Sequence, residues 1–444
     1  MLGWSLIGPF LLCGTLFFVE LRRCKSRGPI DFLTAVNAVY FICFVVTPVF
    51  LRWVADAGRV PLLWRAVLVI DQDSPLFILS GLVVWLSYLF LAWGYFSGSA
   101  WIAAPAQVTR SGLISWGCVL LVGGGFSIAF YASQIGGLRF LLETVLLYRA
   151  QAEPVYTQFT FLKTFSVVAT GSTVLILGGL LERPTQRLPL FFLLAASVIV
   201  SLLVLIAGGG RLAVIQYLLI FPLYFIVRDR AVPLRTVAFC IVVFLAITTF
   251  GHGLFDLFNS PGRLESEVAS VGLDPAAAVI SVLIEFSFPW VNVASALSWA
   301  GSDLALRWFL DVPLAIAWLL PKRLLGLELP PTIGMEHEVL IGHPFPPDLL
   351  SFGIYSAYVP GAFLVAWFFG RIVRALENYV PASGSPAWLV LRAAWLAYIG
   401  SRVMYGNPHH TLTSALPLLI ATVVMLVEPA RLFRRFNTTV ASPR

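Results

Sequence analysis

Residues 188–207 read LPLFFLLAASVIVSLLVLIA, a stretch without one charged side chain. A run of about 20 apolar residues is the length at which an α-helix crosses the hydrocarbon core of a bilayer. The whole chain has this character, because 59% of its 444 residues are hydrophobic and 11% are charged. Soluble domains carry about 25% charged residues. The composition therefore excludes a soluble enzyme, a nucleic-acid-binding module and a disordered regulator, and it indicates an all-α polytopic membrane protein.

Similar stretches on both sides of this segment predict about 11 transmembrane helices in total. The other expected spans are 2–20, 31–51, 76–97, 111–131, 158–181, 211–227, 233–250, 351–370, 387–405 and 411–428. Two shorter apolar segments, 276–300 and 304–320, carry charges. For these a spanning hairpin, a re-entrant pair and amphipathic surface helices remain open, so the number of spans could reach 13.

The basic residues predict the orientation. Arg22, Arg23, Lys25 and Arg27 follow the first expected span, and the C-terminal tail is also rich in arginine. Loops rich in lysine and arginine stay in the cytoplasm. We therefore expect an outer N-terminus and a cytoplasmic C-terminus. The chain then divides into transmembrane helices in 1–250, a large outer loop in 251–350 with amphipathic or re-entrant helices, and C-terminal transmembrane helices with a cytoplasmic tail in 351–444.

The outer loop holds a histidine flanked by carboxylates. In PTIGMEHEVLIGHPFPPD, His337 stands between Glu336 and Glu338, and His343 follows in a proline-rich stretch. A histidine oriented by a carboxylate can act as a general base near neutral pH. A polar loop without a catalytic role is the alternative. The spacing lacks the converging ligands that zinc requires, so we expect no metal.

Basic side chains near the outer ends of the spans are candidate anion ligands. Arg211 follows three glycines at a tight turn, where the backbone and the start of a helix can approach a phosphate. The alternative is that Arg211 extends to the lipid headgroups. Arg402 lies near the outer end of 387–405 and is a second candidate, whereas Arg392, toward the cytoplasmic end, is expected to be structural.

Three further basic residues lie in the outer loop. Arg307 precedes Asp311 by one helical turn, so the two side chains could simply pair on one face of a helix. Lys322 and Arg323 follow Pro321 and could hold an anionic headgroup, with ordinary contact to the membrane interface as the alternative.

Three stretches of the chain resemble the O-antigen polymerase family, the Wzy-type oligosaccharide repeat-unit polymerases. DFLTAVNAVYFICFVVTP resembles the second span of that family, and 208–211 resembles its Gly/Ser-Arg turn. PPDLLSFGIYSAYVPGAFLVAWFFGRI resembles the segment that leads from the large periplasmic loop into a late span. The related O-antigen ligases share an arginine turn, a second arginine and a loop histidine, which Arg211, Arg307 and either His337 or His343 match in order.

The resemblance implies a GT-C-like glycosyltransferase that uses no nucleotide sugar and no cofactor. It would polymerise undecaprenyl-pyrophosphate-linked repeat units into lipopolysaccharide O-antigen or a capsular or exopolysaccharide, at the periplasmic face of the bacterial inner membrane. Its partners would be these lipid-linked glycans and the bilayer, with a chain-length regulator as a further candidate and no nucleic acid. The site would comprise His337, Glu336 and His343 as catalytic residues and Arg211, Arg307, Lys322, Arg323 and Arg402 as pyrophosphate ligands.

Elementary chemistry agrees with this assignment. Outside the cytoplasm there is no pool of nucleotide sugars, so an activated sugar must arrive on a lipid. A departing pyrophosphate needs cations, and an attacking hydroxyl needs a base. Two alternatives stay open: a ligase that transfers the glycan to another acceptor, and a transporter or flippase of the lipid-linked glycan.

Overall fold

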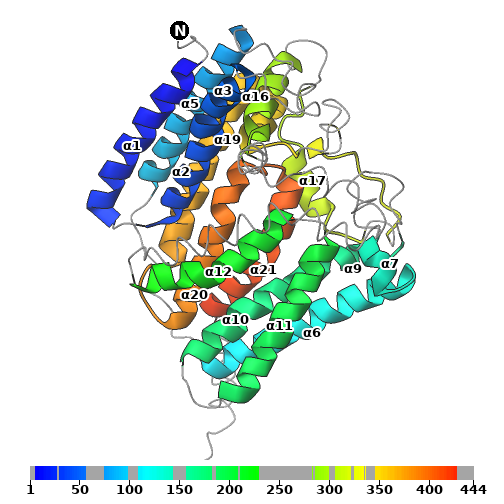
Figure 1. The fold of residues 1–444 in the computed structure, drawn as a ribbon. Coiled ribbons are helices and arrows are strands. Elements are labelled where there is room, and N and C mark those ends of the chain that lie inside the picture. The colour runs from blue at the N-terminus through cyan, green and yellow to red at the C-terminus, as the bar shows by residue number, and fades with distance from the viewer. Residues whose placement is uncertain are drawn as a thin grey trace, which may run out of the picture.

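The computed structural model describes residues 6–27, 30–56, 75–98, 109–143, 157–182, 187–208, 211–229, 283, 286–299, 306–321, 325–334, 336 and 346–427. Within these ranges every regular element is a helix (Figure 1). Eight of the described helices are long and apolar enough to cross a membrane. By helix length and composition, the chain is a multi-pass membrane protein.

The helices in the first half of the chain are α1 (Ile7–Arg27), α2 (Phe32–Phe41), η2 (Ile42–Val46), α3 (Thr47–Asp56), α5 (Pro75–Ser97), α6 (Arg110–Gln134), α7 (Leu138–Glu143), α9 (Thr160–Phe165), η3 (Ser166–Val168), α10 (Ala169–Glu182), α11 (Arg187–Ala207) and α12 (Arg211–Asp229). Those in the second half are α16 (Phe288–Trp299), α17 (Asp311–Ala317), α19 (Leu349–Tyr379), α20 (Pro386–Ile399), η4 (Gly400–Val403) and α21 (Pro408–Val427).

Most of the expected spans are confirmed as long apolar helices. The matching expectations are 31–51, 76–97, 111–131, 158–181, 188–207, 211–227, 351–370 and 411–428. Of the others, 2–20 corresponds to α1, which carries Glu20, Arg22 and Arg23 in its second half and is not among the eight. The expected span 233–250 lies outside the described residues.

The expected span 387–405 is shorter than predicted. Its α-helix, α20, has 14 residues, and the tighter 3-10 turn η4 follows at once. At 1.5 Å per residue, α20 is about 21 Å long, less than the roughly 30 Å of a bilayer core.

The two ambiguous segments of the outer loop also form short helices where they are described. Helix α16 has 12 residues and α17 has 7, and each is too short to span a bilayer. Helix α16 is instead buried, and it packs against α5 and α19.

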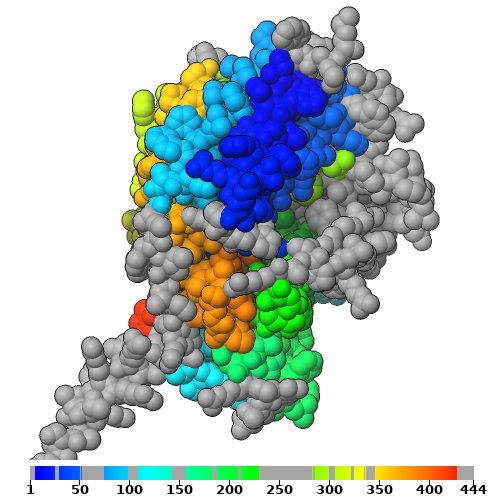
Figure 2. Space-filling model, turned by 90° about the vertical axis from the view of Figure 1, so that its left-hand side faces the viewer, coloured from blue at the N-terminus to red at the C-terminus, as the bar shows by residue number. Residues whose placement is uncertain are grey.

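Two groups of helices are joined by a third. Helices α1, α2, α5, α16 and α19 form the first group, and α6, α10 and α11 form the second (Figure 1). Helices α12, α20 and α21 lie between them, with α12 packed along α20 and α10 in contact with both α20 and α21. In Figure 2, α20 and α12 lie side by side below α1 and α5.

The packed glycines give the relative directions of the helices. Gly94 of α5 lies against Trp367 of α19, and Phe90 stacks on Phe363, so α5 and α19 run parallel. Gly178, near the end of α10, lies against Ala387 at the start of α20. The end of α10 and the start of α20 therefore share one end of the bundle, and the start of α10 and the end of α20 share the other.

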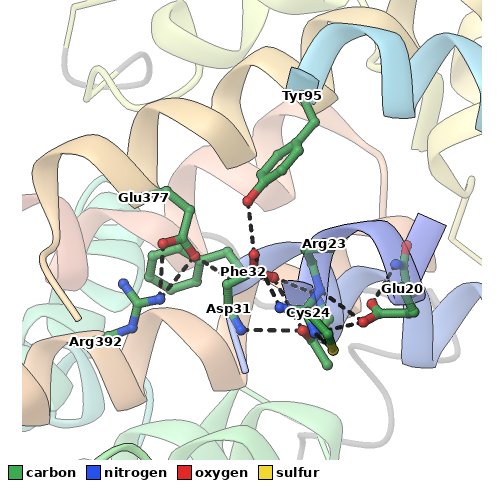
Figure 3. A network of polar contacts seen from close by, with 10 residues as sticks. Glu20, Arg23, Cys24, Asp31, Phe32, Tyr95, Glu377 and Arg392 are labelled. Atoms are coloured by element: carbon green, nitrogen blue, oxygen red, sulfur yellow. Dashed lines mark hydrogen bonds and ion pairs between the residues drawn. The ribbon is translucent and has the colours of Figure 1, made fainter. Parts of the chain in front are cut away.

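A network of buried ion pairs ties the helices together at one end, which we call the network end (Figure 3). Arg23 contacts Glu20 at 2.6 Å and Asp31 at 3.4 Å, and Asp31 accepts a hydrogen bond from the hydroxyl of Tyr95. Arg392 binds both carboxylate oxygens of Glu377 at 2.9 Å. The same carboxylate accepts the backbone N–H of Phe32, and the Arg392 guanidinium lies over the Phe32 ring. The network thus joins α1, α2, α5, α19 and α20.

Helix α19 is broken inside a segment that the sequence predicts as an ordinary span. Ala357 and Tyr358 have non-helical backbone angles, and Tyr358 has a φ of 57°. The chain bends so sharply that an ideal Cβ on Gly353 would lie 2.6 Å from the Cα of Ala362, which only glycine allows. The carbonyl oxygens of Tyr355 and Ser356 accept the backbone N–H groups of Arg307 and Trp308. The loop before α17 therefore satisfies the backbone groups freed by the break.

Candidate functional site

A cavity of about 290 Å³ lies at the end of the bundle opposite the network, which we call the cavity end. It lies where α9, α12 and α21 begin and where α11 and α20 end. Most of its wall is apolar, which suits a ligand with a hydrophobic part. The main polar lining residues are Lys163, Gln216, Tyr217, Tyr398, His410 and Thr413. No aspartate or glutamate is among the described residues that line it.

Arg402 stands directly behind this wall. Its guanidinium lies 4.4 Å from the ring centroid of Tyr398, a lining residue, and 5.8 Å from that of Tyr405. The ring of Tyr405 in turn contacts His410, which also lines the cavity. Arg402 is therefore one side chain removed from the cavity on two sides.

Arg402 is buried without a carboxylate among the described residues. Its side chain is 2% exposed, and its Nε and Nη2 donate to the hydroxyl of Ser401. The third nitrogen, Nη1, is buried and has no hydrogen-bond partner there. Because arginine stays protonated, a buried guanidinium without an anion is costly. The arrangement is that of a cation prepared for an anionic ligand.

Local structure explains how Arg402 is held. An ideal Cβ on Gly400 would lie 2.7 Å from the carbonyl oxygen of Ala35 in α2, so the chain comes this close only with glycine. The tight turn η4 follows and carries Arg402 inward between the two tyrosine rings. The sequence predicted Arg402 close to His409 and His410, and in the structure Tyr405 contacts both Arg402 and His410. Arg392 was expected to be structural, and it pairs with Glu377.

The helix ends on either side of the predicted glycine-arginine turn lie at the cavity end. Helix α11 ends at Ala207, Gly208 lines the cavity, and α12 begins at Arg211. Ala213 and Gln216, in the first two turns of α12, line the cavity as well. The start of α12, whose backbone N–H groups and dipole favour an anion, thus belongs to the cavity wall. Of Arg211 itself only the backbone is described.

Two lining residues were not singled out from the sequence. Lys163 comes from α9, and Gln216 comes from α12. The signal for Lys163 was available, because it is the single charged residue of the expected span 158–181, and charges inside spans are costly and usually functional. Gln216 gave a weaker signal, since an isolated amide in an apolar run is common in buried helices.

Arg307 has its donors occupied by protein groups. Its Nε and Nη2 bind the carboxylate of Asp311 at 2.6 and 3.1 Å, and Nη1 binds Glu336 at 2.5 Å. Nη2 also donates to the carbonyl of Pro331. Burial acts to lower the pKa of Arg307, but the hydrogen bonds and charges of the two carboxylates raise it overall. The pairing with Asp311, foreseen as the alternative to a pyrophosphate contact, is thus present.

Only part of the predicted loop site is described. Glu336 is 38% exposed at its side chain and accepts from Arg307. His337, His343, Lys322 and Arg323 lie outside the described residues. Of the described part of the outer loop, α17 packs against α21, whose first turns line the cavity, and the ring of Trp318 lies 5.8 Å from that of His409.

We compared the chain with protein-family models, with curated proteins and with solved structures, and none of the three comparisons gave a match. The functional assignment of this membrane protein therefore depends on its sequence and on the chemistry of its own site.

Proposed function

We propose that the protein is a polysaccharide polymerase that uses undecaprenyl-pyrophosphate-linked oligosaccharide repeat units. It acts at the periplasmic face of a bacterial inner membrane, with its N-terminus in the periplasm, its C-terminus in the cytoplasm and about 11 spans in a GT-C-like arrangement. In this orientation the cavity end faces the periplasm. The proposal combines the resemblance with the chemistry of the cavity.

The buried Arg402 carries the proposal. A membrane-embedded cation without a carboxylate among the described residues, beside a cavity whose wall is apolar with a basic edge, favours an amphipathic anion. A prenyl pyrophosphate has this chemistry, with two phosphates at the end of an apolar chain. The cations would neutralise the charge that develops on the pyrophosphate as it departs.

The proposed reaction is a displacement at the anomeric carbon of the donor glycan. The hydroxyl oxygen of the acceptor repeat unit attacks that carbon and forms the new glycosidic bond. The bond from the carbon to the pyrophosphate oxygen breaks, and its electron pair leaves with the pyrophosphate. The hydroxyl proton passes to a base, for which His337 is the first candidate and His343 the second.

Glu336 has a modified role in this proposal. The carboxylate of Glu336 accepts a hydrogen bond from Arg307, which lies just before α17. In this proposal, Glu336 positions its neighbour His337, the general base, through the backbone. The carboxylate of Glu338 then orients the imidazole of His337. We keep Lys322 and Arg323 as candidate pyrophosphate ligands, an assignment that rests on the sequence alone.

A transporter of the lipid-linked glycan is the second candidate. One observation favours it: α19 is broken within a membrane-spanning segment, and discontinuous helices are typical of secondary transporters. Against it, the buried arginines of the network end, Arg23 and Arg392, are paired with carboxylates, whereas Arg402 at the cavity end has no carboxylate partner among the described residues. A ligase that transfers the same glycan to a different acceptor would use the same chemistry.

The test is to measure extension of a purified lipid-linked repeat unit by the purified protein in detergent. Without a membrane there are no two compartments, so the assay does not depend on transport. Arg402→Met should lower the rate at least about tenfold, because it removes a buried positive charge behind the wall that faces the departing pyrophosphate. Arg22→Met, which removes an exposed arginine of α1, is the matched control and should extend normally. Full activity of Arg402→Met would exclude this role for the cavity. A wild-type protein that moves the lipid across vesicles but extends nothing would favour the transporter.

A further inference from the structure

The pyrophosphate of the carrier lipid needs more than one cation, and the structure indicates a residue for this task that the sequence did not. Arg307 was the expected second ligand after Arg211. All of its nitrogens, however, donate to Asp311, Glu336 or Pro331. A phosphate could reach Arg307 only by displacing these partners. Among the described residues that line the cavity, Lys163 is the only lysine or arginine.

The other polar groups of the cavity wall are mostly engaged with the protein. Tyr217 shares a hydrogen bond with Thr173, and Tyr398 donates to the carbonyl of Thr411. The hydroxyl of Thr413 donates to the carbonyl of His409. These side chains therefore shape the wall, and their hydroxyl groups are committed before a ligand arrives.

Gln216 differs from these neighbours. Its Nε2 is buried and has no hydrogen-bond partner among the described residues. An amide donor buried without an acceptor costs free energy in the empty protein. Gln216 lies one helical turn after the start of α12, on the same wall as Gly208 and Ala213. A ligand oxygen in the cavity would satisfy this donor and would lie near the positive end of the helix dipole.

We propose that Lys163 and Gln216 bind the phosphate oxygens of a prenyl pyrophosphate in this cavity, with Arg402 as the long-range counter-charge behind Tyr398. Lys163 supplies the second cation, and Arg307 instead positions the loop before α17. The apolar side of the wall, including Val204, Leu205 and Ile220, holds the first part of the prenyl chain. The identity of the ligand rests on the proposed function, whereas the two residues and their chemistry rest on the cavity.

The experiment measures binding of geranylgeranyl pyrophosphate to the purified full-length protein in detergent. Geranylgeraniol, which lacks the phosphates, and inorganic pyrophosphate, which lacks the chain, are the comparison ligands. We expect Lys163→Met and Gln216→Leu each to weaken binding at least tenfold, and Lys163→Arg to retain most of it. Lys25→Met, which removes an exposed lysine of α1, is the matched control and should bind as the wild type does.

Folding is checked by the melting temperature without ligand. Gln216→Leu removes a buried donor that has no partner among the described residues, so its melting temperature should equal or exceed that of the wild type. A purely structural role for Gln216 would instead lower it. Should Lys163→Met fail to fold, Lys163→Gln provides the neutral variant.

Three results would overturn the inference. Wild-type affinity in Gln216→Leu or in the neutral Lys163 variant would remove these residues from the site. Equal affinity for inorganic pyrophosphate would show that the apolar wall contributes nothing to binding and that the ligand is free pyrophosphate. The extension assay on the same preparations separates the two proposals. Normal extension with unaffected binding in the variants would refute this inference alone, and ligand binding without any extension would refute the proposed function alone.

Discussion

The two ends of the helix bundle differ in whether their buried arginines are paired with carboxylates. At the network end, Arg392 binds both oxygens of Glu377, and Arg23 lies between Glu20 and Asp31 (Figure 3). At the cavity end, Arg402 is equally buried, but its partners among the described residues are the hydroxyl of Ser401 and the side chains of Tyr398 and Tyr405, and none is a carboxylate. Arg392 and Arg402 belong to one continuous segment, α20 followed by η4. Both are buried arginines, and they differ in their partners, because Arg392 has a carboxylate and Arg402 has none among the described residues.

The comparison separates the tasks of the two ends. A buried arginine with a carboxylate completes the fold, because removing either partner strands the other charge. A buried arginine without one keeps a binding capacity that the fold itself does not use. The network end therefore holds α1, α2, α5, α19 and α20 together. At the cavity end, a bound anion would be stabilised by the charge of Arg402.

The largest expected effect lies at the network end. Glu377→Gln leaves Arg392 buried without its carboxylate, so we expect a loss of about 3–5 kcal/mol in the free energy of unfolding. Unfolding in mixed micelles of increasing SDS content measures it. Asp229→Asn is the matched control, because the Arg228–Asp229 pair is 46% and 43% exposed and such pairs contribute about 0–1 kcal/mol. Equal losses in the two variants would contradict the structural role of the network.

The next effect is expected at Asp348, a buried carboxylate that forms no ion pair with a cation among the described residues. Its Oδ1 accepts the N–H groups of Leu350 and Ser351 at the start of α19, and its Oδ2 has no hydrogen-bond partner among the described residues. Burial raises the pKa of Asp348 to about 7, although the hydrogen bonds from Ser351 and Leu350 act to lower it. Unlike Arg402, this group can become neutral by taking up a proton.

The consequence is a defined pH dependence of stability. The folded protein keeps the Asp348 proton up to about pH 7, whereas the unfolded chain releases it near pH 4. The contribution of Asp348 is therefore most favourable below pH 4, is lost as the pH rises toward 7 and is constant above, a decline of about 4 kcal/mol for the roughly three pKa units between the two states. Asp348→Asn, which can still cap the helix, should abolish this component. An unchanged pH profile in the variant would show that Asp348 is ionised in the fold.

The smallest expected effect on stability is that of Arg402→Met. No carboxylate among the described residues is stranded by the change, and an uncompensated buried charge is removed. The free energy of unfolding without ligand should therefore stay within about 1 kcal/mol of the wild type, in contrast to Glu377→Gln. The same SDS titration measures it. A loss as large as that of Glu377→Gln would show that Arg402 has a carboxylate partner in residues that the structure does not describe.

Several features of the molecule followed from the sequence alone. The apolar runs predicted the membrane helices, because a helix satisfies its own backbone hydrogen bonds and needs no partner to be stable in lipid. The helix boundary near Gly208 and Arg211 and the structural pairing of Arg392 were also predictable, since glycine content and position within a span are local properties.

The rest depended on contacts between helices that are far apart in the chain. Pairing of Arg307 with Glu336, burial of Arg402 between Tyr398 and Tyr405, and the meeting of Lys163 with Gln216 at one cavity are decided only when the bundle is packed. The break in α19 belongs here too, because the N–H groups that satisfy its carbonyls come from Arg307 and Trp308. A local pattern determines which segments enter the membrane, and only tertiary packing determines which charges there find a partner.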